Sequence, residues 1–217
     1  MKNLILFCAA VCAAAFADIN QSFAQSTQPR LGIKAGVDLT SITTTTSGSS
    51  TTKYNYRAGV QVGLFAEFQL SKQFSVSPQF LFTQKGGNEG VTSSSFGSLT
   101  SAGSYKVQIN YLDIPVLFIY KVQPKLVLCV GPQVGLLLSQ KTSYTNNIGG
   151  VPQSFAITST AGFRKAPIGG NVGVGYKVCN HAGINLNYMF DLQKMLTNNY
   201  AKGAKNHGFA LTASYLF

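Results

Sequence analysis

Residues 54–70 (YNYRAGVQVGLFAEFQL) alternate between two kinds of side chain over their whole length. One parity, from Tyr54 to Leu70, is wholly apolar, whereas the other is mostly polar and carries the charges of Arg57 and Glu67. Successive side chains of a β-strand point to opposite faces, so the segment predicts a strand with one apolar face and one polar face. A tilted strand of about 9–11 residues crosses a bilayer, and this alternation is typical of a membrane barrel.

Further segments along the chain repeat the pattern, and short turns alternate with long polar stretches between them. This spacing is typical of outer-membrane barrels, which have short periplasmic turns and long external loops. We therefore expect an all-β fold, an eight-stranded antiparallel transmembrane β-barrel of outer-membrane type. The predicted strands are 31–42, 54–70, 73–85, 104–121, 124–138, 166–179, 182–192 and 207–217. The predicted long connections are 43–53, 86–103, 139–165 and 193–206.

Three local features refine this prediction. Asn110 and Asp113 have opposite parity within one predicted strand, which predicts a face switch and a β-bulge between them. The low-complexity tract 41–52 predicts a solvated loop. The longest connection is expected to fold over the barrel mouth because it contains apolar residues, namely Phe155, Ile157 and Phe163.

The amino-terminal residues have the composition of a secretory signal peptide: a lysine, an apolar run and then small residues. We expect residues 1–24 to be the signal peptide, with cleavage before Gln25; cleavage before Asp18 is the alternative. Residues 25–217 then form one barrel domain in the bacterial outer membrane, with lipid as its surroundings. The formal charge of +11 is spread thinly and forms no basic stripe, so nucleic acid is not an expected partner.

Charged residues of the predicted strands fall mainly on the inward parity. The interior of an eight-stranded barrel is just wide enough for side chains to fill it, and buried charges need partners. We expect an interior network of ion pairs, while a narrow polar conduit gated by the same charges stays open as an alternative. The residues of this predicted network are Lys34, Asp38, Arg57, Glu67, Lys85, Asp113, Lys177 and Asp191.

The sequence contains no recognisable catalytic, cofactor or metal motif, so we expect none of these sites. The one arrangement that favours an enzyme is His207 near Asp191, which would be half of a hydrolytic triad. Cys129 and Cys179 share the inward parity of neighbouring strands. Either a cross-strand disulfide or two small buried residues would explain them, and both interpretations stay open.

The last predicted strand ends in aromatic residues of one parity, and Phe209, Tyr215 and Phe217 carry this pattern. It resembles the carboxy-terminal signal by which the outer-membrane insertion machinery recognises its clients. We therefore expect that machinery to be a partner during assembly.

Six segments spread over the chain follow the pattern of one known family. They are KAGVDLTSI (34–42), GLFAEFQLSKQFSVSPQFLFTQKGG (63–87), YLDIPVLFIYKV (111–122), GPQVGLLLS (131–139), GVGYKV (173–178) and SYLF (214–217). Together they resemble the PorT-like family of outer-membrane β-barrel proteins of Bacteroidetes. The resemblance implies an eight-stranded outer-membrane barrel, and the namesake of the family is implicated in protein export by the type IX route. We expect a monomeric, non-enzymatic structural or accessory component with other envelope or secretion proteins as partners. A narrow solute channel and a lipid-modifying hydrolase are the alternatives.

Overall fold

The computed structural model consists of β-strands joined by turns and loops. None of the residues it describes belongs to a helix that is long and apolar enough to cross a membrane. The described residues are 28–45, 51–96, 99–148, 151–196 and 203–217. The strands are β1 (Arg30–Thr45), β2 (Thr51–Lys53), β3 (Arg57–Gln69), β4 (Phe74–Phe96), β5 (Leu99–Lys121), β6 (Leu126–Ile148), β7 (Val151–Thr158), β8 (Ile168–Lys177), β9 (Ala182–Asp191) and β10 (Lys205–Leu216).

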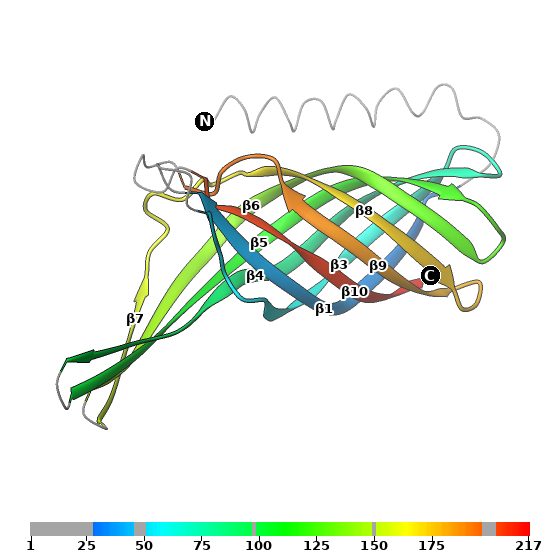
Figure 1. Ribbon diagram of the computed structural model, residues 1–217. Helices are drawn as coiled ribbons and strands as arrows, with labels where there is room; N and C mark the ends of the chain where they lie inside the picture. Colours follow the sequence, from blue (N-terminus) through cyan, green and yellow to red (C-terminus); the bar gives the residue numbers. More distant parts are fainter. Residues whose placement is uncertain (1–27, 46–50, 97–98, 149–150, 197–202) are drawn as a thin grey trace.

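The strands close into a ring, which Figure 1 shows from the side. Neighbours pair antiparallel in the order β10-β9-β8-β6-β5-β4-β3-β1, and β1 pairs again with β10 from Gly32↔Leu216 to Thr43↔Lys205. The strands β2 and β7 lie outside the ring, paired with the ends of β1 and β6. The predicted eight-stranded antiparallel barrel is therefore confirmed.

The ring sorts the alternating side chains as their sequence parity predicts. In β3, Gln61 and Glu67 are buried in the lumen, whereas Val62 and Leu64 are 50% and 61% exposed on the outside. Large apolar side chains cover the rest of the outer surface in the same way, because this surface faces lipid and the lumen does not. Other members of this apolar belt are Leu31, Ile33, Val37, Leu39, Phe80, Phe118, Leu128, Val130, Val172, Ile184, Leu186, Phe209 and Leu211.

Two of the predicted loops are instead extensions of the barrel strands. The connection predicted at 86–103 is a hairpin made by the ends of β4 and β5, and much of 139–165 is a hairpin of β6 and β7. These extensions form a projecting sheet, at the lower left of Figure 1, in the order β4-β5-β6-β7. The prediction was wrong here because a strand beyond the lipid needs no apolar face, and residues 153–158 of β7 are exposed on both faces. Their sequences therefore lack the alternation that identified the barrel strands.

The tract 41–52 is also more structured than predicted. Strand β1 continues to Thr45, and residues 43–45 pair with β2. Residues 46–50, between these strands, lie outside the described residues. The threonines of this tract favour an extended conformation because they are β-branched.

The predicted irregularity near Asn110 exists, but the extra residue lies on the neighbouring strand. The register passes from Asn110↔Ser139 to Tyr111↔Leu137, so Leu138 of β6 has no partner in β5. Asn110 keeps the outward parity of β5 and donates from Nδ2 to Ser139 Oγ at 2.8 Å. The predicted face switch in β5 is therefore wrong. Leu138 shifts the faces of β6 instead, since a bulge inserts one residue into one strand of a pair.

Candidate functional site

The barrel has two ends of different construction. At the turn end, β3–β4, β5–β6 and β8–β9 are joined by tight turns, with backbone hydrogen bonds such as Leu70 N to Phe74 O at 2.9 Å. At the loop end lie the projecting sheet and the connection between β9 and β10. Between these two ends the lumen contains three successive levels: a cavity, a polar middle layer and an apolar cluster.

The middle layer is centred on a buried ion pair. Lys85 Nζ of β4 lies 2.8 Å from Asp113 Oδ2 of β5 and donates to Oδ1 at 3.1 Å. Their side chains are 5% and 0% exposed. Asp38 and Asp191 also attract the Lys85 ammonium group. Asp38 is fully buried, and neither of its carboxylate oxygens has a hydrogen-bond partner among the described residues.

Amide and apolar side chains fill the rest of the middle layer. Asn187 Nδ2 donates to Asn171 Oδ1 at 2.8 Å, and Gln61 Nε2 donates to Thr83 Oγ1 at 3.3 Å. Leu81 is buried among these polar groups, as is Met189, whose sulfur accepts from Gln61. The interior is therefore packed across its width at this level, as expected for a barrel of eight strands.

An apolar cluster closes the loop end of the lumen. It consists of buried side chains from β1, β5 and the connection between β9 and β10, and Phe163 packs against it. The backbone N–H of Arg164 donates to Met195 O at 2.6 Å and fixes the two connections to each other. Phe163 thus lies over the mouth as expected. Phe155 and Ile157 do not, because β7 pairs with β6 and leaves both exposed. The buried members of the cluster are Ile42, Val107, Ile109, Tyr111, Met195 and Ala204.

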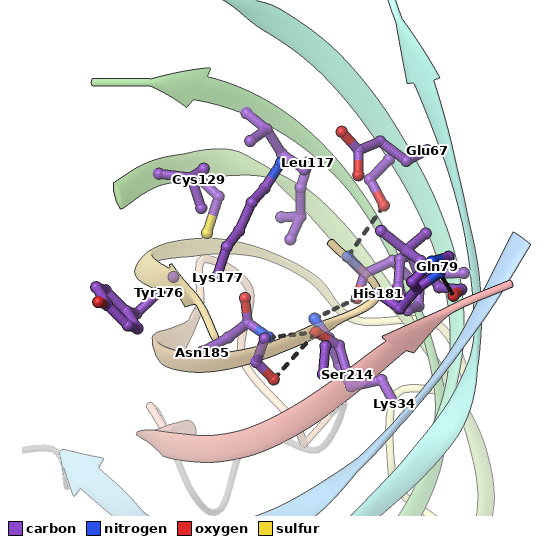
Figure 2. A pocket seen from close by; sticks show the side chains of 18 of the residues that line it. Lys34, Glu67, Gln79, Leu117, Cys129, Tyr176, Lys177, His181, Asn185 and Ser214 are labelled. Atoms are coloured by element: carbon purple, nitrogen blue, oxygen red, sulfur yellow. Dashed lines mark hydrogen bonds between the residues drawn. The ribbon is translucent and has the colours of Figure 1, made fainter. Parts of the chain in front are cut away.

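The turn end contains a cavity of about 70 Å³, shown in Figure 2. Lys34 lines it and donates from Nζ to Gln79 Oε1 at 3.0 Å. Glu67 and Lys177 line it nearer the turns, and Glu67 Oε1 accepts from Ser75 Oγ at 3.0 Å. Parity predicts the inward orientation of Gln79, but not its contact with Lys34, because parity does not give register.

The predicted interior charges therefore separate along the barrel axis. Lys85 and Asp113 form the one ion pair in the described part of the chain, with the carboxylates of Asp38 and Asp191 near it. Another group, Lys34, Glu67 and Lys177, lies towards the turn end. Arg57 lies at the loop end of β3, where Nη2 donates to Gln108 Oε1 at 2.8 Å. Acidic groups predominate in the middle layer and basic groups in the cavity.

His207 and Asp191 do not meet, although their strands are neighbours. His207 pairs with Phe190 in register and contacts the Tyr56 ring edge-on, with 6.2 Å between centroids. Asp191 Oδ2 instead accepts from Asn206 N at 3.3 Å. His207 has the outward parity of β10, so the predicted His–Asp contact of a hydrolytic triad is wrong. In the described ranges no group of three acidic, histidine or cysteine side chains could hold a metal ion.

The two cysteines of the barrel are free thiols. Cys129 is buried and accepts at Sγ from Asn187 Nδ2 at 3.4 Å, whereas Cys179 is exposed in the turn between β8 and β9. The disulfide alternative is therefore not formed. The other interpretation, two buried residues, holds for Cys129 alone.

The matched family agrees with this architecture. Residues 23–197 match the family model described as outer membrane protein beta-barrel domain. The chain belongs to this family. Membership of this family points to the bacterial outer membrane as the location of the chain. There the apolar belt of the barrel faces lipid. A comparison with curated proteins found no match.

Several solved structures are similar to this outer-membrane barrel. The attachment invasion locus protein Ail of Yersinia pestis is 13% identical, with 88% of this chain and 100% of that chain covered and a TM-score of 0.43. Neisserial surface protein A is 11% identical, with coverage of 88% and 100% and a TM-score of 0.45. OprG from Pseudomonas aeruginosa is 12% identical, with coverage of 87% and 95% and a TM-score of 0.40.

The barrel presents the aromatic residues of β10, and Phe217 which follows it, on its outer surface. Phe209, Tyr215 and Phe217 are all exposed there. The Phe209 ring lies 5.1 Å from that of Tyr188 on β9, and the Tyr215 ring lies 5.7 Å from that of Phe217. This position faces lipid, and recognition of these residues by the insertion machinery stays a prediction.

Outside the lipid belt, the projecting sheet carries an aromatic row that the sequence did not suggest. The Tyr144 ring of β6 lies 4.9 Å from that of Tyr105 on β5 and 4.9 Å from that of Phe155 on β7. Tyr54, between β2 and β3, extends the row, with its ring 6.1 Å from Tyr105. Burial raises the pKa of Tyr54, and the nearby Glu89 and Tyr144 raise it further.

Proposed function

We propose that this outer-membrane barrel is a non-enzymatic, closed component of the cell envelope that acts through its two ends. The observation that carries the proposal is a lumen that is blocked beyond the turn-end cavity. The Lys85–Asp113 layer fills its middle, and the apolar cluster lies beyond that layer at the loop end. A protein with such an interior offers its projecting sheet and its turn end to partners, and turns of outer-membrane barrels face the periplasm.

A link to protein secretion is the more specific form of this proposal. The resemblance of six strand and turn segments to the PorT-like family supports it. In this form the barrel is a monomeric accessory subunit that contacts other envelope or secretion proteins.

Mild cross-linking of intact cells tests the accessory role. The barrel would carry an affinity tag between β1 and β2, and an unrelated small barrel with the same tag would be the control. Reproducible recovery of the same envelope proteins with this barrel alone is expected. Recovery of the barrel by itself, together with normal secretion and a normal envelope barrier in a clean deletion strain, would contradict the proposal.

A narrow solute channel is the second candidate, and the cavity at the turn end is the observation that favours it. Refolded protein in a planar bilayer distinguishes the two functions. A closed component gives no discrete conductance steps, whereas a channel gives steps that Glu67→Gln or Arg57→Gln alters. Such steps from the wild-type protein would replace the first proposal by the second.

A further inference from the structure

Lys34 is a buried cation with no acidic partner in the described part of the chain. The residue is 6% exposed, and the one hydrogen bond that Nζ makes among the described residues goes to the neutral amide oxygen of Gln79 at 3.0 Å. The Phe65 ring lies 5.9 Å from Nζ and gives partial stabilisation through its π face. Burial of an ammonium group without a counter-charge is costly, so the site favours an added negative charge.

The neighbouring polar groups leave hydrogen-bond donors available. An ammonium group has three N–H donors, and Gln79 Oε1 uses one of those on Lys34. Gln79 Nε2 donates to Ser77 Oγ at 3.4 Å, which directs the amide oxygen towards Lys34. Ser77 is 1% exposed, and its hydroxyl proton has no acceptor among the described residues. Lys34 and Ser77 thus provide donors on either side of one amide group, and both line the cavity.

The cavity sets an upper limit on what these donors can bind. Its volume is about 70 Å³, and a site for one water requires at least ~10–15 Å³ on this measure. A few water-sized groups therefore fit, which is enough for a carboxylate with a short tail. A sugar or a nucleotide is too large.

The charges near the turn end favour the entry of an anion. Lys177 and Glu67 line the cavity. Lys121 lies close enough to Lys177, Glu67 and Arg30 to interact electrostatically with each of them. Basic groups therefore outnumber acidic ones around the entrance, and a cleft with charges of one sign concentrates ions of the opposite sign. The surplus carboxylates lie in the middle layer, beyond the end of the cavity.

We propose that the turn-end cavity is a binding site for a small carboxylate anion, with Lys34 as its charged ligand and Ser77 as a second donor. The site opens towards the turns of the barrel, so it takes its ligand from the periplasmic side. This inference is independent of the proposed accessory role.

The proposal is tested by titrating the refolded barrel with acetate in detergent micelles. Binding is monitored by the NMR signals of the Gln79 and Asn187 side-chain amides. Sodium gluconate at equal concentration is the control for ionic strength, because gluconate is too large for the cavity. Saturable shifts with acetate alone are expected. Lys34→Gln should weaken acetate binding at least tenfold, and Ser77→Ala, which keeps the charge, should weaken it severalfold.

Lys125→Gln is the matched control, since Lys125 is an exposed lysine in the β5–β6 turn. Binding should be unchanged in this variant. A variant counts as folded when the unboiled protein migrates faster on a gel than the boiled protein. If Lys34→Gln does not fold, Ser77→Ala still tests the proposal. The proposal is overturned by shifts that do not saturate, by equal shifts with gluconate, or by full acetate binding in folded Lys34→Gln or in Ser77→Ala.

Discussion

Lys85 of β4 and Asp113 of β5 form an ion pair inside the barrel, with 2.8 Å between Nζ and Oδ2. The pair lies beside two further carboxylates, those of Asp38 and Asp191, which also attract the Lys85 ammonium group. One lysine thus offsets the charge of several buried acids. Removal of Lys85 leaves these acids without their counter-charge, whereas removal of Asp113 leaves Lys85 with the other two.

This asymmetry predicts an order of stabilities. Breaking a buried pair by removing one partner typically costs ~3–5 kcal/mol. We expect Asp113→Asn to lower the free energy of unfolding by about 3 kcal/mol or less, because Asp38 and Asp191 still attract Lys85. Lys85→Met should cost more. The free energies of unfolding of both variants are measured by urea unfolding in lipid vesicles, with the gel migration of unboiled samples as the readout. Glu89→Gln, in the projecting sheet, is the control, and equal stability of Lys85→Met and wild type would contradict the prediction.

Gly63 allows β3 and β4 to approach each other closely. A Cβ atom at this position would lie 1.9 Å from Phe80 O, a backbone atom that cannot rotate away. We expect Gly63→Val to prevent pairing of the two strands and to abolish the fast-migrating folded band. Ala35→Val on the lipid-facing side of β1 should fold normally, since Ala35 is exposed there. A folded Gly63→Val barrel would show that the strands can separate without loss of the ring.

Tyr144 holds the aromatic row of the projecting sheet together. Its ring contacts those of Tyr105 and Phe155, and an aromatic pair contributes ~0.5–1.5 kcal/mol beyond area burial. Tyr144→Ser should therefore speed hydrogen exchange of β7 amides about tenfold without an effect on the barrel strands. Thr145→Ser, an exposed position of the same strand, is the control. Unchanged exchange in β7 would mean that backbone pairing alone holds this sheet.

The buried phenol of Tyr54 predicts a pH dependence at the loop end. Its pKa is raised, so the folded state binds the phenolic proton more tightly than the unfolded state, whose pKa is about 10. This contribution to stability is present below pH ~10 and is lost as the pH rises through the folded pKa. We expect proteolysis of the β1–β3 connection to accelerate above that pH in the wild type and much less in Tyr54→Phe. The same acceleration in both proteins would assign the effect to another group.

The sequence determines the barrel because lipid imposes a strict pattern on it. In β3 the buried residues all share the parity of Gln61, and the exposed residues all share the parity of Leu64. The eight ring strands were predictable for the same reason. The ends of β4, β5 and β6 were not, because strands beyond the lipid need no apolar face, so no alternation is imposed on them.

Contacts between the interior side chains were decided by the tertiary structure. Parity places Lys34, Lys85 and Asp113 inside, but strand register and tilt decide that Lys85 meets Asp113 and that Lys34 meets Gln79. The separation of His207 from Asp191 follows likewise from their opposite faces on neighbouring strands. The sequence by itself thus determined which side of the wall each residue occupies, since that depends only on a period of two. Strand register and tilt decided the partners, because Lys85 and Asp113 lie on neighbouring strands and Lys34 and Gln79 on strands separated by β3, and parity does not set the height of a residue along the barrel axis.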